Sequence, residues 1–190
     1  MSERQNGQTY EQLATHYLEN AAKNFRRLKE SADRAAAQVD DEGFFRLIDD
    51  ESNSIALVFK HLSGNLRSRW TDFLTTDGDK PDRRRDSEFV VEEGDTRSAL
   101  AERWEAGWQT LFDTLASLRP EDLLATVRIR GQGHTVVEAV NRQLAHYGEH
   151  VGQIVLLAKH VAGRRWQTLS IARGQSEAFN AEMDKKHGRS

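Results

Sequence analysis

The sequence predicts an all-α protein built as a four-helix bundle. Apolar residues recur at steps of three and four in four long segments, and the two prolines, Pro81 and Pro120, lie between those segments. Only one short stretch alternates as a strand does. The 190 residues are enough for one domain with a substantial core. We therefore expect a single domain over residues 1–190, with its core in about 9–163 and a partly mobile extension in 164–190.

The first half of the chain is expected to hold two of the long helices. The first covers about residues 9–39, and residues 44–48 add a short helical turn. The second begins at Asn53 or Ser54, because either side chain can cap a helix N-terminus. Residues 75–89, which contain an Asp-Gly pair and a proline, are expected to form a long loop.

The second half is expected to hold the other two. Asp95 or Thr96 can cap the third helix, which the second proline ends. Residues 126–136 alternate briefly and predict a short extended piece or hairpin. The fourth helix covers about residues 135–162, and Gly163 closes it.

Composition excludes several classes of function. A formal net charge of −3 gives no reason to expect nucleic-acid binding. The absence of cysteine excludes disulfides, thiolate metal ligands and cysteine nucleophiles, and it fits a reducing compartment. The N-terminus lacks a signal-peptide core, and no apolar run approaches the roughly 18 residues of a membrane span. We therefore expect a cytoplasmic protein that binds neither nucleic acid nor a membrane.

His146 and His150 are the strongest chemical signal in the chain. They lie four positions apart, so both imidazoles leave one face of the fourth helix, where they can bind one cation or simply face water. A zinc protease needs glutamate directly after the first histidine, whereas Tyr147 occupies that position and Glu149 points away. The Glu-x-x-His motif of dimetal carboxylate bundles is also missing. The pair therefore favours a mononuclear site or none.

A mononuclear site needs a third ligand from another helix. His61 lies on the corresponding flank of the second helix, and His16 lies beside the apolar stripe of the first. His160 is excluded because it lies about 15 Å along the fourth helix from His150. Helix geometry alone leaves the choice between His61 and His16 open.

Two polar residues share the side of the second helix that carries His61. Asn65 and Arg69 follow at four-residue steps, and they form either a solvated flank or the wall of a pocket. In a pocket, Asn65 would contact a metal-binding residue or the substrate, and Arg69 would bind an anion. The three arginines at 83–85 favour surface ion pairs with Asp86. The alternative is that their loop folds over the bundle end and supplies an arginine to an anionic substrate.

Three glycines inside the predicted helices need an explanation, because each costs about 1 kcal/mol relative to alanine. Close helix packing is the favoured reason, and room for a ligand is the alternative. Tyr147 lies on an apolar stripe and is expected in the core. The three glycines are Gly64, Gly148 and Gly152.

Three segments resemble a branch of the DinB/YfiT-like superfamily of predicted metalloenzymes, and together they cover most of the chain from Asn53 to Asn180. The resemblance implies a DinB-like four-helix bundle. It also implies that one histidine of the second helix and the HxxxH motif of the fourth bind a divalent metal, which carries over to His61, His146 and His150. The segments are NSIALVFKHLSGNLRSRWTDFLTTDGDKPDRRRDSEF, RIRGQGHTVVEAVNRQLAHYGEHVGQIVLLAK and LSIARGQSEAFN.

The superfamily includes metal-dependent transferases that act with low-molecular-weight thiols, and related isomerases. The resemblance therefore implies a thiol S-transferase, in which an open position on a Zn, Ni or Fe ion binds a thiol and lowers its pKa. Asn65 and Arg69 would orient the substrate. The alternative is a non-catalytic metal-binding or stress-related module, whose ion has four protein ligands. Proteins of this fold often pair through their long helices, so a homodimer is also implied.

Overall fold

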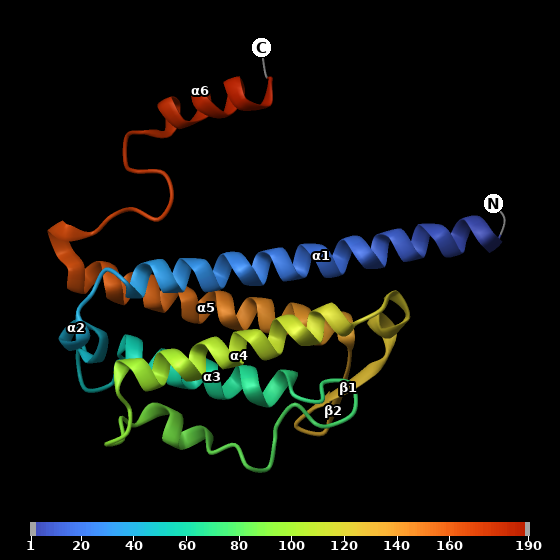
Figure 1. Cartoon of the computed structure of the whole chain (residues 1–190), viewed down its shortest axis with the longest axis horizontal. Helices are drawn as coiled ribbons and strands as arrows, with labels where there is room; N and C mark the ends of the chain where they lie inside the picture. The colour runs from blue at the N-terminus through green and yellow to red at the C-terminus, as the bar shows by residue number, and fades with distance from the viewer. Residues whose placement is uncertain (1–2, 189–190) are drawn as a thin grey trace.

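The computed structural model describes residues 3–188 and is mostly helical, which confirms the predicted all-α class. Four long helices run alongside one another (Figure 1): α3 packs against α4 and α5, and α1 packs against α5. No helix in the described part of the chain is long and apolar enough to cross a membrane. The long helices are α1 (Glu3–Ala36), α3 (Ile55–Trp70), α4 (Arg97–Ser117) and α5 (Val136–Ala162).

Shorter elements connect and extend these helices. Residues 126–135 form the predicted hairpin, in which Val127 pairs with His134 across two antiparallel strands. Its turn places Arg130 and Gly131 at positive φ, 54° and 76°. The shorter elements are α2 (Asp41–Phe45), η1 (Arg85–Phe89), η2 (Pro120–Leu124), β1 (Thr126–Ile129), β2 (Gln132–Thr135), η3 (Gly163–Arg165) and α6 (Ser176–His187).

Side-chain caps fix where the long helices begin. The hydroxyls of Ser54 and Thr96 accept hydrogen bonds from the backbone N–H groups three residues ahead, at the starts of α3 and α4. Thr135 caps α5 in the same way, and Glu138 bonds back to it in a capping box. Gly163 ends α5 with φ 54°, a conformation that favours glycine. The predicted starts of these three helices are confirmed, while α1 begins six residues earlier than expected.

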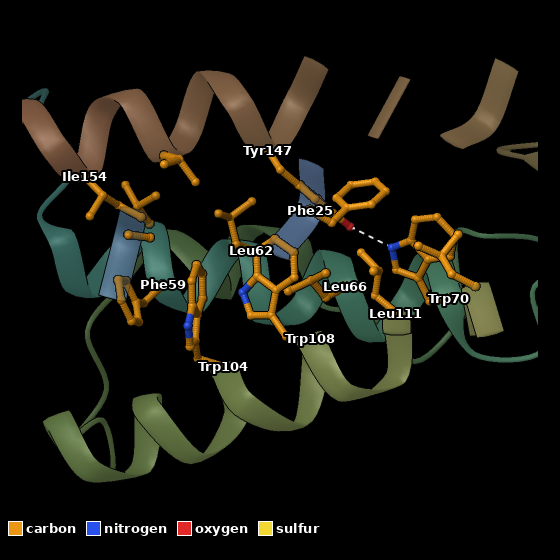
Figure 2. Close-up of a cluster of buried hydrophobic side chains, with 14 of the residues drawn as sticks. Phe25, Phe59, Leu62, Leu66, Trp70, Trp104, Trp108, Leu111, Tyr147 and Ile154 are labelled. Carbon is orange, nitrogen blue, oxygen red and sulfur yellow. Dashed lines mark hydrogen bonds between the residues drawn. The ribbon is translucent and has the colours of Figure 1, made fainter. Parts of the chain in front are cut away.

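The core between the long helices is rich in aromatic side chains (Figure 2). Trp70, Trp104, Trp108 and Tyr147 are each at most 1% exposed. Tyr147 is thus a core residue, as predicted, and its hydroxyl accepts a hydrogen bond from Trp70 Nε1 at 3.1 Å. Edge contacts join Trp108 to Trp104 and Tyr147 and add stabilisation beyond the area that the rings bury. This core holds α3 and α5 at the spacing on which the site depends.

Two of the elements that the sequence did not predict, η1 and α6, bear on the site and on the end of the chain. η1 lies inside the segment predicted as a long loop, and it packs against α3. α6 lies in the extension 164–190, where the sequence predicted a partly mobile segment; residues 189 and 190 fall outside the described part. Figure 1 shows α6 apart from the other helices, and none of its residues is buried.

Candidate metal centre

Three histidines from two helices meet between α3 and α5. His61 comes from α3, and His146 and His150 come from successive turns of α5. One ring nitrogen of each lies within 4.8 Å of the corresponding atoms of the other two. His61 is buried, while His146 and His150 are partly exposed. Three imidazole nitrogens so close together are compatible with binding a metal ion, and the group is not fully enclosed because His146 and His150 are partly exposed.

A buried polar network sets the register of the two helices next to this group. Asn65 Oδ1 accepts hydrogen bonds from Gln143 Nε2 at 2.7 Å and from the Tyr147 hydroxyl at 3.1 Å. Gln143 Nε2 also donates to the Tyr147 hydroxyl at 3.0 Å. Since sliding either helix would leave these groups unpaired in the core, the network opposes movement of α5 along α3.

A carboxylate from outside the long helices contacts His61. Glu88 Oε2 lies 2.8 Å from His61 Nδ1, and the side chains of Glu88 and His61 are 8% and 5% exposed. Arg83 donates to both carboxylate oxygens, from Nε and Nη2, each at 2.8 Å. Burial acts to raise the pKa of Glu88, but hydrogen bonds from Arg83 and His61 outweigh it and hold the pKa below its ordinary value. Glu88 is thus an ionised hydrogen-bond acceptor.

The two histidines of α5 are held in their neutral form. Burial, followed by the charges of His150 and His61, lowers the pKa of His146 to about 3. Burial also lowers the pKa of His150, whose Nδ1 lies 3.0 Å from Gln153 Oε1. Metal ions bind the unprotonated ring nitrogen, so neutral imidazoles are the form that a metal site requires.

An unpaired ring nitrogen in the group also fits a bound metal ion. His146 Nδ1 is buried and has no hydrogen-bond partner within residues 3–188, so no hydrogen bond there compensates for the water that it loses on burial. Among the described residues, the cluster of potential ligands contains three members. His16, the other third ligand that the sequence left open, is exposed and does not belong to the cluster.

Asn65 and Arg69, the predicted substrate contacts, are both buried. Asn65 belongs to the network described above. Arg69 donates to the carbonyl oxygen of Gly78 and lies 3.6 Å from Asp79 Oδ1, while its Nε has no partner within residues 3–188. The positive charge of Arg69 contributes to lowering the pKa of His146, so it acts on the histidine group.

Glu88 was not expected from the sequence, and Arg83 has a different role from the expected one. The prediction of surface ion pairs for residues 83–85 is wrong for Arg83, whose side chain is 5% exposed and binds Glu88. It holds for Arg85, which lies 3.9 Å from Asp86 at the surface. The available signal was Gly64: a Cβ there would overlap Glu88 Oε1 and lie 2.8 Å from Cδ. A glycine inside a helix can thus mark the approach of a side chain, although it does not say which one.

Comparison with known proteins adds one match. The family model described as Protein of unknown function (DUF1572) matches residues 12–175. That span includes every residue of the histidine group and of the Glu88–Arg83 pair. No curated protein matches the chain, and no solved structure does.

Proposed function

We propose that this chain, which belongs to the DUF1572 family, binds a divalent transition-metal ion through His61, His146 and His150. The observation that carries the proposal is the meeting of three imidazole nitrogens within 4.8 Å of one another. The proposal includes a DinB-like four-helix bundle, formed by the four long helices. Three imidazoles suit Zn, Ni or Fe.

An open, reactive site is favoured over a closed, structural one. A structural ion takes four protein ligands, whereas the potential ligands grouped here within residues 3–188 are three histidines. The partial exposure of His146 and His150 supports an open position. A non-catalytic metal-binding module is the alternative that the experiments below distinguish.

The proposed reaction is transfer of a low-molecular-weight thiol to an electrophile. A divalent ion with an open position would supply a Lewis acid that lowers the pKa of a thiol. The chain's own residues would hold the ion, keep its ligands neutral and orient the substrate. Arg69 is proposed to attract an anionic substrate group, because its buried positive charge already acts on His146. Asn65 is proposed as a neighbouring contact, one helical turn from His61.

Metal analysis of the purified full chain tests the site. We expect about one equivalent of divalent metal in the wild type after equilibration with Zn²⁺, and a large loss in His150→Ala. The matched control is His160→Ala, because His160 lies on the same helix, is exposed and is not part of the group. Equal metal content in the wild type and His150→Ala would show that the three histidines do not form the site.

The reaction is tested separately, by incubating the metal-loaded protein with an electrophile and each of bacillithiol, mycothiol and glutathione. We expect metal-dependent conjugation with one of these thiols, and its loss in His150→Ala. A protein that binds metal and conjugates none of the three would favour the non-catalytic module.

A further inference from the structure

The contact between Glu88 and His61 fixes where the proton of that ring lies. Arg83 has only hydrogen-bond donors and bonds both oxygens of Glu88, so this carboxylate acts as an acceptor, and His61 Nδ1, 2.8 Å from Oε2, must carry the proton. In the neutral ring the other nitrogen, Nε2, is then free of a proton. This is the atom that remains available on the side of the ring away from Glu88.

Glu88 is itself held in place. Arg83 donates to both of its oxygens at 2.8 Å, in the paired geometry that gives guanidinium–carboxylate contacts their directionality. The ring of Phe89 lies against His61, with centroids 4.8 Å apart and planes at 31°. The three side chains come from one short segment, which therefore restrains both the rotation and the tilt of the imidazole.

The three histidines differ in how they are held. His61 has a buried, charged partner, whereas His150 contacts the neutral amide of Gln153 in a more exposed position. The strongest restraint thus falls on the one ligand that comes from the other helix.

We propose that Glu88, oriented by Arg83, is a positioning residue that keeps the His61 proton on Nδ1 and directs Nε2 toward His146 and His150. This inference rests on the proposed metal site. A carboxylate that hydrogen-bonds a ligating imidazole fixes its tautomer and makes its free nitrogen a better donor, and removing such a partner lowers metal affinity by about 10–100-fold.

The first test measures Zn²⁺ affinity of the full chain by competition with a chromophoric chelator. One variant is Glu88→Gln, and a second is the double change Arg83→Met with Glu88→Met, which leaves no buried charge unpaired. We expect both to bind Zn²⁺ about 10–100-fold more weakly than the wild type. Wild-type affinity in both folded variants would overturn the proposal.

Asp95→Asn is the matched control. Asp95 is 2% exposed and bonds Lys60 Nζ at 2.6 Å, so it also anchors the connection between α3 and α4 but contacts none of the three histidines. We expect its Zn²⁺ affinity to stay within about twofold of the wild type. An equal loss in Asp95→Asn would show that Glu88 acts only by holding this connection in place, which contradicts a positioning role.

A second readout needs no metal. In the metal-free wild type, the ¹⁵N shifts of His61 should show a protonated Nδ1 and a bare Nε2, and the double methionine variant should lose this preference. A neutral ring with its proton on Nε2 and a bare Nδ1 in the wild type would overturn the proposal even if every variant failed to fold. A wild type with no Zn²⁺ affinity would instead refute the metal site, while the ¹⁵N shifts would still decide the role of Glu88.

Discussion

Gly64 of α3 has no side chain, which makes room for Glu88, a residue far away in the sequence. The Glu88 carboxylate occupies the space that a side chain at position 64 would need. Gly148 and Gly152 differ, because a Cβ at either position would meet nothing within 4 Å. Close packing within the chain, the favoured reason for all three glycines, is therefore wrong for the two on α5. At Gly64 the close neighbour is a polar side chain of the connecting segment.

This difference predicts opposite effects of the same substitution. Gly152→Ala should stabilise the protein by up to about 1 kcal/mol, because alanine is the better helix former and the added methyl group has room. Gly64→Ala gains the same helix propensity but displaces Glu88, leaving Arg83 and His61 without their partner. We expect a net loss of about 1–3 kcal/mol in the free energy of unfolding.

Urea denaturation of both variants measures these effects, and Zn²⁺ titration of Gly64→Ala adds an independent check. The affinity of that variant should fall, although no polar group has been changed. If Gly64→Ala were as stable and bound Zn²⁺ as tightly as Gly152→Ala, the packing of Glu88 over α3 would be wrong.

At the scale of elements, buried polar contacts anchor the end of the connection between α3 and α4 to both helices. Lys60 Nζ binds Asp95 Oδ2 at 2.6 Å, Glu92 Oε2 at 2.9 Å and the Val90 carbonyl oxygen at 2.9 Å. Arg103 of α4 adds a bond to the other oxygen of Asp95 at 2.8 Å. Asp95 therefore joins both helices to the end of this connection, next to the segment that holds Glu88.

The anchoring by Asp95 should depend on pH. Burial acts to raise the pKa of Asp95, but bonds from Lys60, the Glu92 backbone and Arg103 outweigh it and hold the pKa below the ordinary 3.8. The folded state thus binds fewer protons here than the unfolded state, so this stabilisation is present above pH 3.8 and is lost as pH falls through the folded-state pKa.

Asp95→Asn should therefore lower the free energy of unfolding by about 1–3 kcal/mol at neutral pH. The difference in this free energy between the variant and the wild type should narrow as pH falls below about 3.8. Urea denaturation at several pH values gives the two stability curves. A constant difference down to pH 2.5 would show that Asp95 does not stabilise the fold through its charge.

The helices were predictable because their signals are local. The apolar residues of each helix recur at steps of three and four, and caps such as Ser54 and Thr135 lie next to the helices that they begin. The pair His146 and His150 is local in the same sense. The contact between His61 and Glu88 joins positions 27 residues apart, so no spacing rule encodes it. His61 was assigned through family resemblance, and no such resemblance pointed to Glu88.

At the scale of the whole molecule, the chain divides at the end of the family match. The DUF1572 model ends at residue 175, and α6 begins at Ser176. The residues just before this boundary still pack on the helices: Gln38 and Gln167 exchange two hydrogen bonds, and Trp166 and Leu169 lie against the core. α6 itself buries no residue. The sequence offered little to predict it, since its apolar residues form no continuous stripe.

Removing residues 176–190 should therefore leave the helical body and the proposed metal site unchanged. No apolar area is lost from the core, so we expect a midpoint of thermal unfolding within about 2 °C of the full chain and the same Zn²⁺ content. The control is truncation after Gly163, which removes the packing of Trp166 and Leu169 and should lower the midpoint. Light scattering of both proteins completes the test. If the chain that lacks residues 176–190 were less stable than the full chain, the division at residue 175 would be wrong. If its mass fell from that of a dimer to that of a monomer, α6 would contribute contacts between copies, and the division would again be wrong.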